Sequence, residues 1–193
     1  MQSTTRSRSP LGPTPPPTPD CRHCGFTTAL NSPDALPETL LEYTTGWQRL
    51  LRDPGHDHRR SGLPAWSPLE QGCHVRDMCQ LFHLRLDAIL GPSPIAPRSP
   101  AEALPDTPRR YRDEEPHRVA DELRQAAEAL ARRLATLTAA DWDRDDPRLA
   151  DPRLTVGFFT RHLLHDIAHD LAEALRVRGD CGTTHQRTGD FHG

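Results

Sequence analysis

The hydrophobic residues of this chain recur at the three- and four-residue spacing of an α-helix in four separate stretches. This pattern predicts helices over Asp34–Arg52, Pro68–Leu90, His117–Thr136 and Thr155–Arg178, with Gly179 ending the last one. No stretch shows the convincing alternation of a strand. We therefore expect an all-α fold, a four-helix bundle, in which the long proline-rich connection between helices 2 and 3 crosses over along the bundle.

The two ends of the chain lack this helical periodicity. Residues 1–20 are rich in Pro, Ser, Thr and Arg, and residues 179–193 are polar, so we expect a disordered tail at each end. Residues 21–33 form a short segment that begins with two cysteines, and residues 34–178 form the predicted bundle. Hydrophobic residues make up only 35% of the chain, which fits a helical domain with disordered ends.

Charge and cysteine content narrow the classes of function. A net charge of −3 gives no basic field for nucleic acid or for an anionic membrane. No apolar run is long enough to span a bilayer, and the N-terminus has no apolar core of a secretory signal. Five cysteines are an odd number, so we expect reduced thiols or metal ligands in a cytoplasmic protein.

Two histidines on the last predicted helix carry the clearest chemical signal. At about 100° per residue, His165 and His169 lie within about 40° of each other, on a stripe with Phe158 and Ala168. A charged imidazole would be costly on a buried stripe, whereas two imidazoles one turn apart can chelate a divalent metal. Two satisfied core histidines, or a helix rotated to turn them toward water, would explain the same spacing.

The second predicted helix adds a third histidine. Its start is marked by Ser67 followed by Glu70, the pattern of a capping box. His74 lies on the face that carries the apolar residues of this helix, so it also points at the core. Glu70 and Asp77 lie near that face, and either could orient the imidazole through its second N–H.

Three core-facing histidines from two helices match a catalytic metal site with one open position. The expected ligands are His74, His165 and His169. His162 lies about 60° from His165 on the same helix and is a further candidate for an outer contact or a pocket wall. The residues do not identify a general base.

A pair of cysteines precedes the predicted bundle. The sequence Cys21-Arg22-His23-Cys24-Gly25-Phe26 is half of a zinc knuckle, because such a turn aims both sulfurs at one point. No second Cys-x-x-Cys follows, so additional ligands would have to come from the helices or from His23. Cys21 and Cys24 are therefore candidate additional metal ligands, with two surface thiols on a docked turn as the alternative.

The stretch from Trp66 to Asp77 resembles the helix-two signature of the DinB-like superfamily, which has Trp-Ser, Glu three residues after the serine and His four after the glutamate. His165-x-x-x-His169 resembles the metal-binding pair on the final helix of that family. The resemblance implies a four-helix bundle with crossed connectivity and a divalent metal held by a triad of histidine ligands, His74, His165 and His169. With Cys-x-x-Cys-Gly-Phe ahead of it, the chain is most similar to an actinobacterial branch.

Relatives in this family include metal-dependent transferases of low-molecular-weight thiols and a mycothiol-dependent maleylpyruvate isomerase. The resemblance thus implies a transferase or isomerase that activates a mycothiol-type thiol as a metal-bound thiolate and passes it to a small electrophile. The ion would be zinc, nickel, iron or manganese. One alternative is a non-catalytic metal-binding bundle whose fourth ligand is Cys21 or Cys24, and another is a metal-dependent hydrolase. The sequence does not determine the oligomeric state; Leu163 and Ile167 lie opposite the histidine face and are a candidate seam for a homodimer.

Overall fold

The computed structural model describes five stretches of the 193-residue chain, and side chains of the last helix are described as far as Arg176. These stretches are residues 20–27, 32–55, 66–91, 110–151 and 153–184. The expected tails over residues 1–19 and 185–193 lie outside the described residues.

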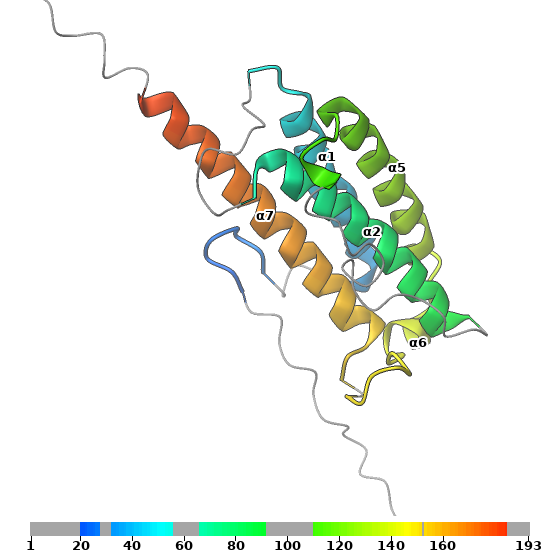
Figure 1. Ribbon diagram of the computed structural model, residues 1–193. Coiled ribbons are helices and arrows are strands. Elements are labelled where there is room, and N and C mark those ends of the chain that lie inside the picture. The colour runs from blue at the N-terminus through cyan, green and yellow to red at the C-terminus, as the bar shows by residue number, and fades with distance from the viewer. Residues whose placement is uncertain (1–19, 28–31, 56–65, 92–109, 152, 185–193) are drawn as a thin grey trace, which may run out of the picture.

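Four long helices pack as a bundle, and the predicted all-α class is confirmed (Figure 1). A 3₁₀ turn leads into the first long helix, and a single helical turn precedes the last. In chain order the elements are η2 (Pro33–Ala35), α1 (Leu36–Arg52), α2 (Pro68–Leu90), α5 (Pro116–Leu134), α6 (Ala139–Trp142) and α7 (Val156–Thr184).

The helices are arranged so that α5 packs against α1 and α2, and α7 packs against the same two helices. Helices α2 and α5 run parallel, because Arg76 contacts Glu122 near their starts and Asp87 contacts Arg133 near their ends. A parallel neighbour requires the chain to return along the length of the bundle between them. The predicted crossover is thus confirmed by its end points, although residues 92–109 lie outside the described part.

Local sequence signals explain where the helices begin. The backbone N–H of Glu70 donates to Ser67 Oγ at 3.2 Å, and the backbone N–H of Ser67 donates to Glu70 Oε2 at 2.8 Å, which completes the predicted capping box of α2. Thr138 and Asp141 form the same reciprocal cap on α6.

The last helix was predicted to end at Gly179, and this prediction was wrong, because α7 continues through Gly179 to Thr184. A single glycine costs a helix only about 1 kcal/mol relative to alanine, which does not stop it.

Helix α7 turns a different face to the core from the one that carries the two histidines. Its buried face contains Leu163 and Ile167, which are 4% and 1% exposed. Trp47 of α1 is fully buried and donates from Nε1 to the backbone oxygen of Ile167 at 3.1 Å. Both residues belong to the interior of the bundle, so they do not form the candidate dimer seam, while the homodimer itself stays a prediction.

The connection between α6 and α7 is held by a buried carboxylate. Asp146 is 1% exposed and accepts hydrogen bonds from Arg85 Nε at 2.9 Å and from Arg148 Nη2 at 2.7 Å. The Arg85 guanidinium also lies 3.6 Å above the ring of Phe159 on α7. Burial alone would raise the pKa of Asp146, but hydrogen bonds from Arg148 and Arg85 outweigh it and lower the pKa to about 2.

None of the described helices combines the length and the apolar character needed to cross a membrane.

Replacing the buried carboxylate should destabilise the bundle. Asp146→Asn removes the buried negative charge that Arg85 and Arg148 both contact, and we expect the free energy of unfolding in urea to fall by about 2–4 kcal/mol at pH 7. The matched control is Asp151→Asn, because Asp151 also pairs with an arginine two residues on but is 34% exposed. The control should change the free energy of unfolding much less, because solvent screens an exposed ion pair. Equal effects of the two changes would contradict the prediction.

The same carboxylate makes stability depend on pH. The pKa of Asp146 is lower in the folded protein than its ordinary value of 3.8, so the unfolded chain binds this proton more tightly. Its contribution to stability is present above about pH 4 and is lost as the pH falls toward 2. The free energies of unfolding that urea titrations give for the wild type and for Asp146→Asn should therefore become equal as the pH approaches 2.

Candidate metal centre

The two cysteines of the N-terminal segment are held in a tight turn. The backbone N–H of Gly25 donates to the oxygen of Cys21 at 2.9 Å, and the N–H of Cys21 donates to the oxygen of Phe26 at 2.9 Å. Gly25 has φ +75°, a left-handed conformation that costs other residues about 1–2 kcal/mol. Phe26 is 1% exposed and anchors the turn to the hydrophobic core.

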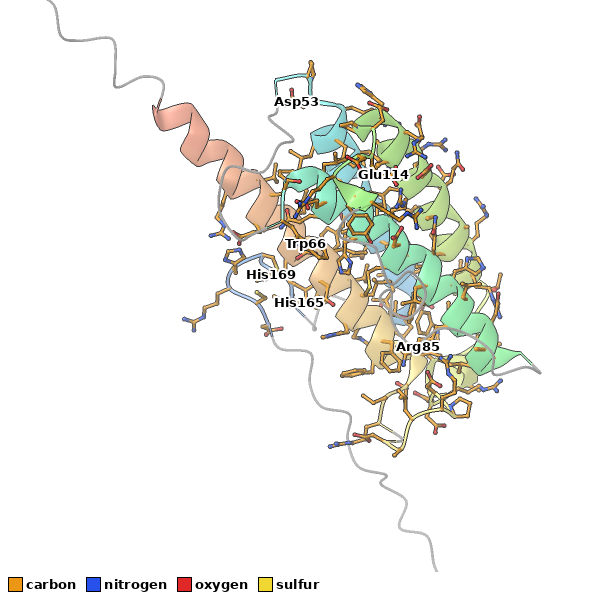
Figure 2. All side chains as sticks on the ribbon, in the orientation of Figure 1. Asp53, Trp66, Arg85, Glu114, His165 and His169 are labelled. Carbon is orange, nitrogen blue, oxygen red and sulfur yellow. The ribbon has the colours of Figure 1, made fainter. Side chains whose placement is uncertain are left out.

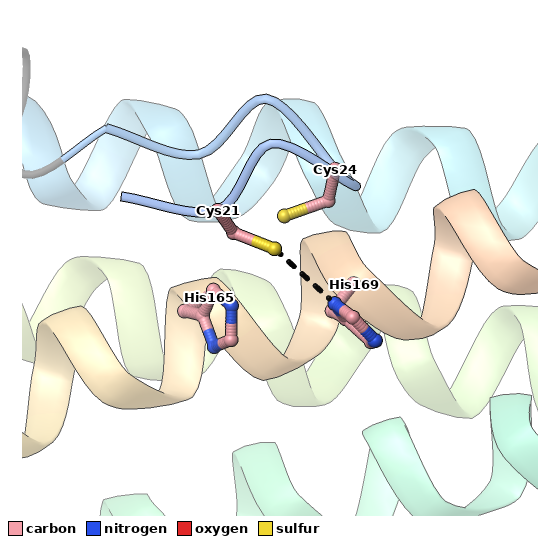
Figure 3. Close-up of side chains that lie close together, drawn as sticks. All are labelled: Cys21, Cys24, His165 and His169. Carbon is pink, nitrogen blue, oxygen red and sulfur yellow. Dashed lines mark hydrogen bonds between the residues drawn. The ribbon is translucent and has the colours of Figure 1, made fainter. Parts of the chain in front are cut away.

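The turn lies over the middle of α7 and faces the two histidines of that helix (Figures 2 and 3). One ligand atom from each of four residues lies within 4.8 Å of all the others. These four residues, which we call the Cys2His2 group, are Cys21, Cys24, His165 and His169. Both sulfurs come from the turn and both imidazoles from α7, so a shared ion would join two elements that are far apart in the sequence.

The distance between two ligand atoms of the group can be compared with the edge of a tetrahedral metal site. Cys21 Sγ lies 3.5 Å from His169 Nδ1. In a tetrahedral zinc site with Zn–S of about 2.3 Å and Zn–N of about 2.0 Å, the S···N edge is about 3.5 Å. Two thiolates with two imidazoles form a donor set that suits zinc, while manganese prefers oxygen ligands. The residues therefore fit a tetrahedral zinc ion with all four positions filled by protein.

The histidines prepare Cys21 to bind a cation. The pKa of the Cys21 thiol is lowered to about 5. The largest cause is a hydrogen bond from His165, and further hydrogen bonds come from the Cys24 backbone and from His169. The thiolate, the form that binds metal, thus predominates at Cys21 at neutral pH. Burial raises the pKa of Cys24, and the hydrogen bond from the Phe26 backbone opposes this. A bound cation would supply the charge that keeps the Cys24 thiolate deprotonated.

A carboxylate fixes the orientation of one imidazole. Asp166 Oδ1 lies 3.3 Å from His165 Nδ1, and its other oxygen lies 3.7 Å from His162 Nε2. A carboxylate at one ring nitrogen fixes the tautomer and leaves the second nitrogen for a metal. His162 therefore lies beside the carboxylate that contacts His165, and its role as an outer contact stays a prediction.

Ring contacts pack the rest of the turn against α7. The Phe26 ring meets His165 edge-on, with centroids 5.6 Å apart, and the His23 ring lies 4.6 Å from that of His169. His23 Nε2 is 3.5 Å from a carboxylate oxygen of Glu173, and Arg176 contacts both side chains. Phe26 and His23 are therefore positioning residues for the two imidazoles. The sequence carried a signal for them only as neighbours of the cysteines.

The expected triad of histidines is not the group that the structure assembles, and this part of the prediction is corrected. His74 lies outside the Cys2His2 group and packs edge-on against Trp66, with ring centroids 5.1 Å apart. Burial lowers the pKa of His74, so the ring is neutral at pH 7. The face of α7 that carries His165 and His169 is half-buried beneath the cysteine turn rather than facing the interior.

The two acidic residues proposed as orienting groups have other partners. Glu70 caps α2 and pairs with Arg112 Nε at 3.2 Å. Asp77 accepts from the hydroxyl of Tyr111 at 2.7 Å and from Arg76 Nε at 2.8 Å. Both carboxylates are thus engaged in the packing of α2 against its neighbours.

Two further described cysteines are core residues. Cys73 and Cys79 are fully buried, and burial raises the pKa of each thiol to about 12. They are inert packing groups. The side chain of Cys181 lies outside the described residues.

The family model of the DinB superfamily matches residues 34–174. The chain belongs to the DinB superfamily. The match runs from the start of the bundle to residue 174 within α7 and includes both histidines of the Cys2His2 group, while both cysteines precede it. Comparisons with curated proteins and with solved structures find no significant match. The DinB superfamily includes metal-dependent enzymes. In this DinB protein, two cysteine thiols lie beside the two histidines.

The left-handed glycine of the turn should control metal affinity. Gly25→Ala strains the backbone at φ +75°, and we expect the zinc dissociation constant to rise about tenfold. Competition against a chromogenic chelator measures this constant. The control is Gly55→Ala, where an added Cβ would meet only the Asp53 carboxylate at 3.4 Å. A Gly25→Ala protein with unchanged affinity would show that the turn does not need this conformation.

Proposed function

We propose that this DinB protein binds one zinc ion in a closed Cys2His2 site and uses it to fasten the N-terminal turn to α7. The observation that carries the proposal is that two sulfurs and two imidazole nitrogens lie within 4.8 Å of one another. Four protein ligands complete a tetrahedral shell, the arrangement typical of structural rather than catalytic zinc. Of the functions considered from sequence, the non-catalytic metal-binding bundle therefore has the most support.

The residues around the ion have separate tasks in this proposal. Bound zinc supplies a cross-link between α7 and the N-terminal turn, which also meets the hydrophobic core through the buried Phe26. Cys21 provides a thiolate at neutral pH, and Asp166 holds His165 in the tautomer that offers a lone pair. His23 packs against the ring of His169 and restricts its rotation.

Metal analysis of the purified protein tests the proposal. The wild type should contain about one zinc per chain, and both Cys21→Ser and His165→Ala should weaken binding by about 100-fold or more, because each removes a ligand. The control is His117→Ala, an exposed histidine at the start of α5. Circular dichroism should show that all variants keep their helices. Zinc bound equally well by Cys21→Ser would overturn the closed site.

A metal-dependent transferase or isomerase acting with a mycothiol-type thiol is the second candidate. It is supported by membership of the superfamily and by the resemblance of His165-x-x-x-His169 to the metal-binding pair of that family. Such a reaction needs an open metal position for the thiol, and displacement of the cysteine turn would provide one. The placement in an actinobacterial branch and the use of a mycothiol-type thiol both rest on the sequence resemblance and stay predictions.

A thiol-consumption assay separates the two candidates. The closed-site proposal expects no zinc-dependent consumption of mycothiol with a small electrophile such as 1-chloro-2,4-dinitrobenzene. The transferase would consume thiol in the wild type and lose that activity when the metal is removed with a chelator. His165→Ala should abolish the activity, and His117→Ala should retain it. Zinc-dependent turnover with this pattern would replace the closed-site proposal by the transferase.

A further inference from the structure

We propose that Cys21 and Cys24 form a redox switch, in which oxidation to a disulfide ejects the zinc ion and disconnects the N-terminal turn from α7. This inference rests on the proposed zinc site and adds a regulatory function to it. It starts from the way in which the four ligands are divided between the two elements.

Both sulfur ligands belong to one turn and both nitrogen ligands belong to one helix. A disulfide between Cys21 and Cys24 therefore removes the whole contribution of the turn in one step. Because only two residues separate the cysteines, the bond closes inside the turn and does not require α7 to move. The ion would be left with two imidazoles, half of its tetrahedral shell, and zinc held by so few protein ligands dissociates readily.

The two thiols of the turn are accessible, whereas the other two described cysteines are not. Cys21 and Cys24 are half-buried, and Arg22, His23 and Gly25 between and beside them are exposed to solvent. Cys73 and Cys79 are 0% exposed in the core. A small oxidant can thus reach the switch thiols without opening the bundle, and oxidation of the described cysteines should be selective.

The reaction needs a two-electron oxidant, and we specify a hydroperoxide such as hydrogen peroxide. One thiolate attacks a peroxide oxygen, so that an S–O bond forms, the O–O bond breaks and the departing hydroxide takes a proton to become water. The second thiolate then attacks that sulfur, so that the S–S bond forms and a second hydroxide leaves as water. Two thiolates lose two electrons, one peroxide gains them with two protons, and Zn²⁺ is released.

Reduction reverses the change. An excess of a small dithiol or thiol exchanges with the disulfide and regenerates both cysteines, and added zinc can then rebind. The four long helices pack directly on one another, so most of the core lies outside the turn even though Phe26 belongs to it. Oxidation should therefore change the attachment of residues 20–27 while the helical content stays nearly constant.

The experiment follows zinc and thiols in the full-length protein carrying Cys181→Ser, which removes the cysteine whose side chain is not described. Zinc-loaded protein is treated with hydrogen peroxide in the presence of a chromogenic zinc indicator, and free thiols are counted in parallel after denaturation. We expect about one zinc to appear for every two thiols lost, and dithiothreitol with added zinc should restore both. Peptide mapping should find Cys21 joined to Cys24.

A variant that keeps four ligands but cannot form the disulfide is the matched control. Cys24→His retains one sulfur and three imidazoles, a set that also suits zinc. We expect it to release zinc at least about tenfold more slowly than the Cys181→Ser protein at the same peroxide concentration. Equal release rates would overturn the switch. If the variant binds no zinc, the peptide map decides, because only a Cys21–Cys24 disulfide supports the proposal.

Failure of the switch is distinguishable from failure of the zinc site. Reduced protein that never binds zinc overturns the proposed function and the switch together. Zinc that binds to reduced protein but stays bound while peroxide oxidises other groups overturns the switch alone. Conversion of Cys21 or Cys24 to sulfinic acid without a disulfide also overturns the switch alone, because the return to the zinc-bound form would then be blocked.

Discussion

The convergence of two thiols and two imidazoles is the constraint on which the functional interpretation of this protein depends. Cys21 and His169 are separated by 148 residues, yet their ligand atoms lie 3.5 Å apart. Without a cation, a low-pKa thiolate meets the two imidazoles through hydrogen bonds, and ring contacts of Phe26 and His23 add to them. With zinc, the same atoms fill a tetrahedral shell and link the N-terminal turn covalently, through metal–ligand bonds, to the last helix.

The bundle prepares one half of this site. Helix α7 is fixed against α1 by the buried Trp47, whose indole N–H donates to the backbone of Ile167 between the two histidines. The close approach of these helices is permitted by Gly46, where an added Cβ would come within 2.7 Å of Leu171. The two imidazoles are thus presented from a rigid, well-packed segment, and the turn is the part that docks onto it.

A donor set that mixes sulfur with nitrogen also changes the chemistry open to a DinB bundle. Three imidazoles would leave an ion its full charge and an open position, whereas two thiolates neutralise Zn²⁺ and fill the shell. A closed and neutral centre is suited to holding structure, and its sulfurs are the groups through which it can respond to oxidants. The same histidine pair can therefore serve a role different from catalysis when a cysteine turn covers it.

The sequence alone determined the helical part of this protein, because its signals are local. Apolar spacing located the four long helices, the capping box placed the start of α2, and His165 with His169 were recognised as neighbours on one face. It also identified the Cys-x-x-Cys-Gly turn as a half-site. Which ligands complete that half-site was decided only by tertiary structure, since periodicity gives the relative angles of side chains on a helix but not the helix's rotation toward its neighbours. That rotation buries Leu163 and Ile167, turns the histidines toward the cysteines, and leaves His74 packed against Trp66 outside the group.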